Sequence, residues 1–329
     1  MRVLSVAVIQ GGPSTEAEVS RASAKGIADA LAQAGHRVTT FELDARLAES
    51  LRIGEFDVVF PIVHGEVGED GSLQGLLEVL QLPYVGSGVL ASALSMDKGT
   101  ARVLFQEAGL PCAKGLRLHR QPVAEAAVIA RREVGSRIVI KPAHHGSAIG
   151  VTRIESTDSI DAVERALQTV FAIDDTAIVE HYAKGREATC GVLDLGDGPR
   201  ALPPTEILTP HDAFYTYQAR YAPGRSVHEC PPNWSSALIV KVQAVAVGAF
   251  AALGCRDLAR ADFIVGDEGE PDRVTLLEVN TLPGFTATSL FPEEAAISGI
   301  PMVDLCDRLA RRAYARGASP RHAALALPT

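Results

Sequence analysis

The sequence predicts an α/β fold that begins with a small doubly wound domain. Apolar runs of strand length alternate with segments of helical periodicity. The first apolar run, residues 3–9, stops at two glycines, and a helix is expected over 20–34. A second buried strand is expected over 57–64, followed by a short helix over 73–80. In such a domain the ligand crevice lies at the carboxyl ends of the parallel strands.

The pattern changes near residue 97, and the rest of the chain predicts two further domains. Strands are expected over 137–141, 177–181, 187–193, 261–265 and 274–279, and helices over 97–109, 235–253 and 304–315. The stretch 203–232 shows no periodicity and carries four aromatic residues, so we expect an irregular active-site lid there. The predicted domains are 1–97, 98–185 and 186–316, followed by a frayed tail over 317–329.

Composition narrows the class of protein. The chain has 329 residues, too many for one ordinary core, and a formal net charge of -9. An acidic balance disfavours nucleic acid, because phosphate binding needs a basic face. The five cysteines are widely spaced without a CxxC pair, which favours a reducing cytoplasm over a disulfide framework or zinc site. The opening apolar run is too short for a membrane span and lacks a signal-peptide cleavage pattern.

Two polar pairs on neighbouring predicted strands suggest a metal site. Arg260 and Asp262 lie two residues apart in the sequence, as do Glu278 and Asn280, so each pair should point to one side of its strand. We expect Leu276 to lie on the same strand face as Glu278 and Asn280. If the strands form a hairpin, two carboxylates and an amide oxygen converge, which are ligands suited to Mg²⁺. From these residues alone, an exposed strand face with a salt bridge is an equally good interpretation.

A lysine that ends a strand precedes a glycine-containing loop. Lys141 is followed by the loop 142–150, whose backbone N–H groups could hold phosphates. The loop is not a Walker A sequence, because GxxxxGK[ST] occurs nowhere in the chain. His144 and His145 lack a plausible third metal ligand, and we expect them to face solvent.

Two stretches of the first domain place polar residues at strand ends. Glu16 lies in the strand-to-helix turn 11–20, where a carboxylate could bind an ammonium group, although Ser14, Thr15 and Glu18 could simply cap the helix. A buried strand delivers His64 to its carboxyl end, where a hydrogen-bonded core histidine is the alternative. The dinucleotide motif GxGxxG is absent after the first strand, which disfavours a dinucleotide enzyme.

Taken together and in this order, the four stretches resemble the D-alanine–D-alanine ligase family of the ATP-grasp superfamily. The most specific piece is HGEVGEDGSLQGLLEVLQLPYVGSGVLASALSMDK over 64–98, and EVNTLPGFTATSLFP over 278–292 is also similar. The resemblance covers about residues 3–312. It implies a three-domain ATP-grasp ligase, with α+β architecture in its ATP-grasp part.

The resemblance also implies a set of ligands. ATP would lie between the second and third domains, and two Mg²⁺ or Mn²⁺ ions would be held by Asp262, Glu278 and Asn280. The nucleotide-binding residues implied are Lys98 and Lys141 at the phosphates, Glu180 at the adenine, Glu187 at the ribose, Gly146 and Ser147 in the loop that closes over the triphosphate, and Arg220 on the lid.

The substrates implied are two D-alanines. Glu16 and His64 would bind the first, and Ser289 and Leu290 would bind the carboxylate of the second. Arg260 and the backbone of Gly284 would stabilise the oxyanion. The remaining implied contact is a hydrogen-bonded trio of Tyr221, Ser147 and Glu16, in which tyrosine favours a dipeptide over an ester to D-lactate.

The activity implied is the joining of two D-alanines through an acyl phosphate, with release of ADP and phosphate, for peptidoglycan precursors. We expect a cytoplasmic homodimer without a nucleic-acid or membrane partner. A relative that uses D-serine or D-lactate, or a non-catalytic ATP-binding relative, is the alternative. Ala17, Ala148 and Arg220 depart from the usual family pattern, which bears on lid affinity and turnover rather than on reaction class.

Overall fold

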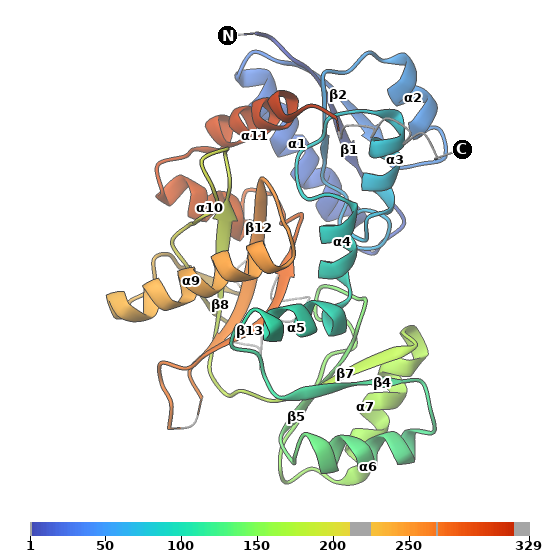
Figure 1. The fold of residues 1–329 in the computed structure, drawn as a ribbon, viewed down its shortest axis with the longest axis vertical. Coiled ribbons are helices and arrows are strands. Elements are labelled where there is room, and N and C mark those ends of the chain that lie inside the picture. Colours follow the sequence, from blue (N-terminus) through green and yellow to red (C-terminus); the bar gives the residue numbers. More distant parts are fainter. Residues whose placement is uncertain (1, 211–224, 268, 319–329) are drawn as a thin grey trace, which may run out of the picture.

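A computed structural model of the chain describes residues 2–210, 225–267 and 269–318, and its strands form three separate sheets. Along the long axis of the molecule, the sheet with β1 lies at one end, the sheet with β8, β12 and β13 in the middle, and the sheet with β4, β5 and β7 at the other end (Figure 1). Within the described residues, no helix is both long and apolar enough to cross a membrane.

The first sheet is parallel, with strand order β2-β1-β3, and it has helices on both faces. One face packs against α1 and α11, and the other packs against α2 and α3. The prediction of a doubly wound opening domain is therefore confirmed. The elements are β1 (Ser5–Gln10), α1 (Ala17–Gln33), β2 (Arg37–Glu42), α2 (Leu47–Ile53), β3 (Val58–Pro61), α3 (Ser72–Leu80) and α11 (Met302–Arg316).

The second sheet is antiparallel, with order β4-β7-β5-β6, and α6 and α7 pack on it. Small alanines of α6 allow close approach to the buried strand residues Ile138 and Ile140. The predicted strands over 137–141 and 177–181 are confirmed. The elements are β4 (Gly115–His119), α6 (Val123–Glu133), β5 (Ile138–Pro142), β6 (Thr152–Ile154), α7 (Ile160–Ile173) and β7 (Thr176–His181).

The third sheet has six strands, in the order β11-β10-β8-β12-β13, with β9 also paired to β8. The apolar helix α9 covers one face. The expectation of an irregular stretch over 203–232 was wrong in part, because β10 and β11 lie within it and pair with each other. The elements are β8 (Arg186–Leu193), β9 (Arg200–Ala201), β10 (Thr205–Leu208), β11 (Val227–Glu229), α9 (Ser236–Ala252), β12 (Leu258–Val265), β13 (Val274–Asn280) and α10 (Leu290–Ile297).

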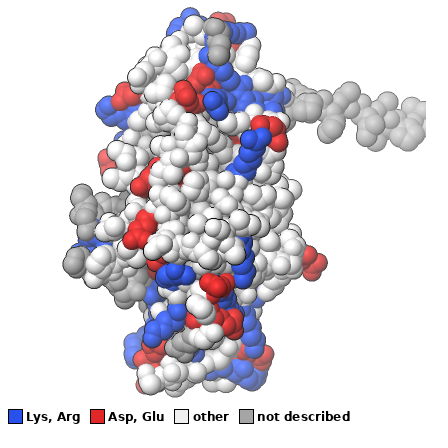
Figure 2. All heavy atoms as spheres, turned by 90° about the vertical axis from the view of Figure 1, so that its left-hand side faces the viewer, with Lys and Arg blue, Asp and Glu red and all other residues white. Residues whose placement is uncertain are grey.

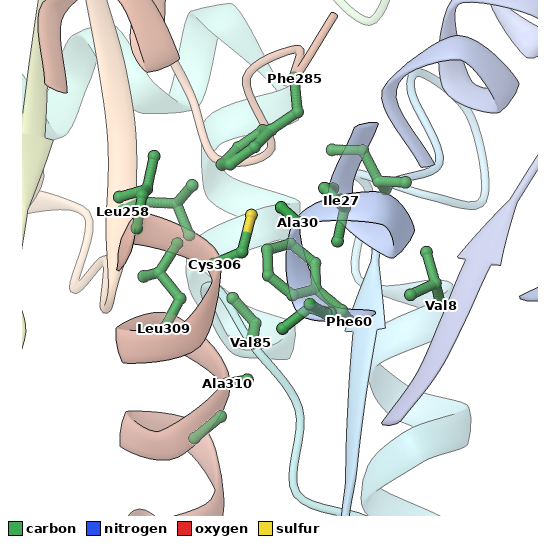
Figure 3. Close-up of a cluster of buried hydrophobic side chains, with 14 of the residues drawn as sticks. Val8, Ile27, Ala30, Phe60, Val85, Leu258, Phe285, Cys306, Leu309 and Ala310 are labelled. Carbon is green, nitrogen blue, oxygen red and sulfur yellow. The ribbon is translucent and has the colours of Figure 1, made fainter. Parts of the chain in front are cut away.

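The last helix returns to the first domain. Leu309 and Ala310 of α11 pack in one buried cluster with Ile27 of α1 and Phe60 of β3 (Figure 3). Leu258, the first residue of β12, and Phe285, which follows β13, join the same cluster (Figure 3). A shared apolar core therefore fixes the hairpin relative to the first sheet.

Helices α4 (Val89–Met96) and α5 (Lys98–Glu107) connect the first sheet to the second (Figure 1). Asp97 caps α5 by accepting a hydrogen bond from the N–H of Thr100 at 2.9 Å. This cap starts the helix at Lys98, so the predicted helix over 97–109 is confirmed.

Charge on one face of the molecule is mixed. Acidic and basic side chains are interspersed in the upper and lower parts of this face, and a broad area between them carries few charges (Figure 2). The described residues of this face thus form no continuous basic surface.

Candidate active site

The β12–β13 hairpin brings the predicted metal-binding residues together. The two strands pair antiparallel, with Asp262 opposite Glu278 and Arg260 opposite Asn280. The side chains of directly opposed residues lie within reach of one another. The predicted hairpin and its pairing are confirmed. The two-residue alternation used for the prediction applies to Arg260 and Asp262 and to Glu278 and Asn280.

A β-bulge in β13 interrupts this alternation immediately before Glu278. The register shifts between Asp262 and Phe263, so that Phe263 pairs with Leu276 and Leu277 is the extra residue. Leu276 is buried against α9, whereas Leu277 and Glu278 both line a cavity. The prediction that Leu276 shares the face of Glu278 was therefore wrong, because the extra residue reverses the alternation.

Arg260 and Asp262 form a buried ion pair. Nε and Nη2 of Arg260 donate to the two carboxylate oxygens of Asp262 at 2.8 and 2.9 Å. Their side chains are 10% and 13% exposed, so the pair does not lie on an exposed strand face. Thr189 donates a third hydrogen bond to Asp262 at 2.8 Å. Full pairing of this carboxylate offsets the cost of removing it from water.

A first cavity, with a volume of about 120 Å³, is lined by five of the predicted nucleotide-binding residues. Of the other two, Ser147 does not line it and Arg220 lies outside the described residues. Lys98, Lys141, Gly146, Glu180, Glu187 and Glu278 all line the cavity. Nζ of Lys141 lies 2.8 Å from Oε2 of Glu180, and both side chains are 9% exposed. Burial lowers the pKa of Lys141, but attraction to Glu180 and Glu278 outweighs it and raises the pKa overall.

The remaining charged residues of this cavity are also paired. Nζ of Lys98 donates to the carbonyl oxygen of His145 at 2.6 Å and lies 3.4 Å from Oε2 of Glu278. Arg153 donates to Glu187 at 2.9 Å. Two lysines and an arginine thus meet carboxylates in a space lined by apolar residues, an environment suited to a charged ligand with a flat ring.

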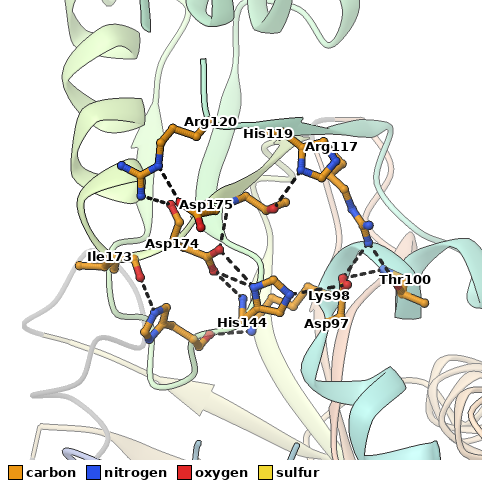
Figure 4. A network of polar contacts seen from close by, with 12 residues as sticks. Asp97, Lys98, Thr100, Arg117, His119, Arg120, His144, Ile173, Asp174 and Asp175 are labelled. Carbon is orange, nitrogen blue, oxygen red and sulfur yellow. Dashed lines mark hydrogen bonds and ion pairs between the residues drawn. The ribbon is translucent and has the colours of Figure 1, made fainter. Parts of the chain in front are cut away.

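The predicted phosphate-binding loop is anchored at its start. His144 donates from its backbone N–H to Asp174 at 2.9 Å, and its ring Nδ1 lies 3.1 Å from the same carboxylate. Its Nε2 lies 3.6 Å from Asp97 (Figure 4). His145 Nε2 lies 3.0 Å from the carbonyl oxygen of Ile173. The side chain of His144 is 49% exposed, as expected, and both histidines also form specific contacts that anchor the loop.

The tip of this loop has an unusual backbone conformation. Ser147 and Ala148 have φ values of +51° and +57°, in the left-handed region that residues other than glycine rarely occupy. Ser147 donates to Oε1 of Glu16 at 2.5 Å, which joins the loop to the first domain. Such strain is found where surrounding contacts impose it, often at functional sites.

A second cavity, with a volume of about 110 Å³, brings together the predicted substrate residues. The predicted residues that line it are Glu16, His64, Gly146, Ser147, Arg260, Glu278, Asn280, Gly284, Ser289 and Leu290. Gly146 and Glu278 also line the first cavity, so the two cavities meet at these residues.

His64 is buried at the end of the first sheet, as predicted. Burial lowers the pKa of its imidazole, against the opposing effect of the Glu16 carboxylate. Its Nε2 has no hydrogen-bond partner among the described residues. Ser14 donates to the carbonyl oxygen of His64 at 2.7 Å and accepts from the N–H of Glu16 at 3.2 Å, which holds Glu16 beside His64.

Gly284 and Ser289 form one wall of the second cavity. A Cβ atom on Gly284 would lie 2.8 Å from Oγ of Ser289, so only glycine fits there without a shift. Oγ of Ser289 accepts from the N–H of Thr286 at 2.9 Å, and helix α10 begins at Leu290. The tight turn therefore places the start of α10 against the cavity.

Sequence reasoning missed two carboxyl groups near this cavity. Glu69 accepts from the N–H of Gly65 at 2.6 Å, and burial together with the charge of Glu16 raises its pKa to about 8, although its side chain is partly exposed. Glu294 is fully buried, and burial raises its pKa to about 8 as well. Glu69 could have been noticed as a candidate, because it lies only five residues after His64. The sequence around Glu294 gave no such indication.

Replacing Glu294 with glutamine tests the raised pKa. A folded-state pKa near 8, against an ordinary 4.5, means that folding takes up a proton between these pH values. The free energy of unfolding of the wild type should therefore fall relative to that of E294Q as pH rises from about 5 to 8, by up to about 1.4 kcal/mol per pH unit. Urea unfolding of both proteins across this range measures it, and parallel curves would contradict the assignment.

Two predicted residues, Arg220 and Tyr221, lie outside the described residues. Their contacts with the phosphate loop and with Glu16 remain predictions from the sequence.

The β12–β13 hairpin offers oxygen ligands for a divalent metal. Among the described residues, no group of three or more His, Cys, Asp and Glu side chains could hold a metal, so Asn280 would have to supply a third ligand. The carboxylates of Asp262 and Glu278 are each paired with a cation of the chain, Arg260 and Lys98. This donor set of hard oxygens therefore fits Mg²⁺ or Mn²⁺.

Comparison with known proteins gives a consistent result. A family model described as D-ala D-ala ligase C-terminus matches residues 104–311, and one described as D-ala D-ala ligase N-terminus matches 45–87. A D-alanine--D-alanine ligase of Granulibacter bethesdensis is 41% identical over 96% of this chain and 100% of that protein. One from Desulforamulus reducens is 40% identical over 94% of this chain and 98% of that protein.

Solved structures agree with these matches. The D-alanine--D-alanine ligase of Bacillus anthracis complexed with ATP has a TM-score of 0.79 at 28% identity, over 96% of this chain and 98% of that one. The enzyme of Coxiella burnetii has a TM-score of 0.78 at 29% identity, over 95% of this chain and 96% of that one. The two cavities meet at Glu278, and the relatives match this chain along nearly its whole length. This chain therefore belongs to the D-alanine–D-alanine ligase family.

Proposed function

We propose that this chain joins two D-alanines into D-alanyl-D-alanine, using ATP and releasing ADP and phosphate. The observation that carries the proposal is the junction of the two cavities at Gly146 and Glu278. One cavity has the lysines that a triphosphate needs, and the other has groups for an amino acid. Phosphoryl transfer depends mainly on positioning and charge neutralisation, which such a junction provides.

ATP would occupy the first cavity. Lys98 and Lys141 would neutralise its phosphates, and the loop around Gly146 and Ser147 would cover them. Glu180 and Glu187 would bind the adenine and the ribose. In the structure, Glu180 is paired with Lys141 and Glu187 with Arg153. A bound nucleotide would replace these cations as the partner of each carboxylate.

Asp262, Glu278 and Asn280 would hold two Mg²⁺ or Mn²⁺ ions. A bound metal would neutralise the charge that develops on the transferred phosphoryl group. Arg260 would then be released from Asp262 and could turn toward the oxyanion, where its planar guanidinium can donate two hydrogen bonds.

The amino acids would occupy the second cavity. The Glu16 carboxylate would hold the ammonium group of the first D-alanine beside neutral His64. The D-alanine carboxylate would attack the γ-phosphate to form an acyl phosphate, and the second amine would displace phosphate from that carbonyl. Ser289 and Leu290 would bind the second carboxylate, and Arg260 with the backbone of Gly284 would stabilise the oxyanion. Excluding water protects the acyl phosphate from hydrolysis.

The setting of this activity is proposed from the sequence and the family. We infer a cytoplasmic homodimer that supplies peptidoglycan precursors in a bacterium, divided near residues 97 and 185 into domains that correspond to the three sheets. Tyr221 favours the dipeptide over an ester.

A substrate panel tests the proposal. ADP formation is measured with D-alanine, L-alanine, D-serine and D-lactate offered singly, and with D-alanine paired with each of the others. We expect turnover with D-alanine alone and D-alanyl-D-alanine as the product found by mass. Turnover only with a mixed pair would move the chain to another second substrate, and ATP binding without turnover would point to a non-catalytic relative.

A further inference from the structure

Glu294 is a buried acid that connects three elements around the second cavity. It lies in the second turn of α10, and its side chain is inaccessible to solvent. Oε2 accepts from the N–H of Gly191 in β8 at 2.6 Å, and Oε1 accepts from Oγ1 of Thr205 in β10 at 2.9 Å. One carboxyl group therefore joins the helix to two neighbouring strands.

The contact with β8 fills a gap in the sheet. On this side of β8, β10 pairs as far as Thr189, and β9 pairs from Val192. Gly191 lies between these two pairings, and its N–H is satisfied by Glu294 instead of by a strand. A Cβ atom on Gly191 would lie 2.7 Å from Oε2 of Glu294, so the glycine and the acid fit only as a pair.

Gly191 of β8 also lies beside Arg260, the residue proposed to stabilise the oxyanion. Gly191 is opposite Arg260 in the β8–β12 pairing, and the charges of Arg260 and Asp262 both act on Glu294. At the other end of the connection, α10 begins at Leu290, next to Ser289. Arg260, Ser289 and Leu290 line one cavity. Glu294 therefore connects the helix that begins beside Ser289 to the strand that pairs with Arg260.

We propose that Glu294 is a positioning residue for the second amino acid. By holding α10 against β8 and β10, it fixes Ser289 and Leu290 at the distance from Arg260 that the second D-alanine requires. This inference rests on the proposed function, which assigns Ser289 and Leu290 to that substrate. The first cavity does not include Glu294 or α10, so ATP binding should be independent of it.

Three variants test this role in steady-state kinetics. Glu294→Leu removes both hydrogen bonds, and we expect the KM for the second D-alanine to rise about tenfold or more, because small displacements of substrate-positioning groups are costly. The KM for ATP should stay within about twofold, since no nucleotide-cavity group is altered. Glu294→Gln keeps the shape, and its amide can keep both contacts if its oxygen accepts from Gly191 and its NH2 group donates to Oγ1 of Thr205, so it should restore the wild-type KM. Thr205→Val removes one contact and should raise this KM by about threefold.

The neighbouring glutamate provides a matched control. Glu293 lies in the same helix, but it bonds His228 of the outer strand β11 at 2.9 Å and its side chain is 38% exposed. Glu293→Gln should leave the KM for the second D-alanine unchanged within about twofold, as expected for a partly exposed pair.

The outcomes separate this inference from the proposed function. An unchanged KM for the second D-alanine in folded E294L, or equal effects on all Michaelis constants, would overturn the positioning role. If E294L does not fold, an unchanged KM in T205V would overturn it. Absence of D-alanyl-D-alanine with the wild-type protein would instead contradict the proposed function.

Discussion

Glu278→Gln is expected to lower turnover by about a thousandfold while the protein stays folded. Glu278 lies where both cavities meet and faces Asp262 across the hairpin. The substitution keeps the size of the side chain and removes its charge. Losing one metal-holding carboxylate removes several kcal/mol of charge stabilisation from phosphoryl transfer, and about 4 kcal/mol corresponds to about a thousandfold. Initial rates of ADP formation at saturating ATP and D-alanine measure the effect.

Stability and local charge need separate controls for this variant. Glu278 is 28% exposed and lies 3.4 Å from Lys98, a loose pair whose loss should change the unfolding free energy by less than about 1 kcal/mol. Glu270→Gln removes a charge from a 64% exposed residue next to the same hairpin and should leave turnover unchanged. Near wild-type turnover in E278Q would remove the metal assignment.

Lys141→Met is expected to abolish ATP binding and to destabilise the protein by about 3–5 kcal/mol. The lysine and Glu180 are paired at 2.8 Å with both side chains 9% exposed. Removing the cation leaves the Glu180 carboxylate buried without its partner. The double variant K141M/E180Q removes both charges and should recover most of the lost stability, while ATP binding stays lost. Urea unfolding and nucleotide titration of the four proteins separate the two effects.

Two results of this double-variant cycle would contradict the prediction. If K141M and E180Q each cost less than about 1 kcal/mol, and their effects add, the pair contributes like a surface salt bridge. The buried pair would then not account for the raised pKa of Lys141. Retained ATP affinity in K141M would contradict the placement of the phosphates.

The parts of the fold with strong periodicity were predictable from the sequence. The hairpin that carries Asp262 and Glu278 follows from alternation, and the buried strand that ends at His64 follows from a continuous apolar run. The edge strand β2 was missed because its residues are mostly exposed and show no buried alternation. The bulge at Leu277 was also missed, because an extra residue leaves no mark in composition.

Contacts between distant segments were not predictable from the sequence alone. Glu294 is one glutamate in the run LFPEEAAI, and its partner Gly191 lies 103 residues earlier. The contact between His144 and Asp174 was not predicted, because the two residues lie 30 positions apart in the sequence. In both cases a polar side chain is fixed by a backbone group or carboxylate that only the tertiary structure supplies.

Oxygen from D-alanine should be found in the released phosphate, because the proposed junction of the cavities at Glu278 brings the D-alanine carboxylate to the γ-phosphate. With D-alanine labelled with ¹⁸O in its carboxylate, attack through that oxygen should leave one ¹⁸O in each inorganic phosphate released, measured by mass spectrometry. Phosphate without ¹⁸O, formed together with D-alanyl-D-alanine, would contradict the account, because the carboxylate would then not have been phosphorylated.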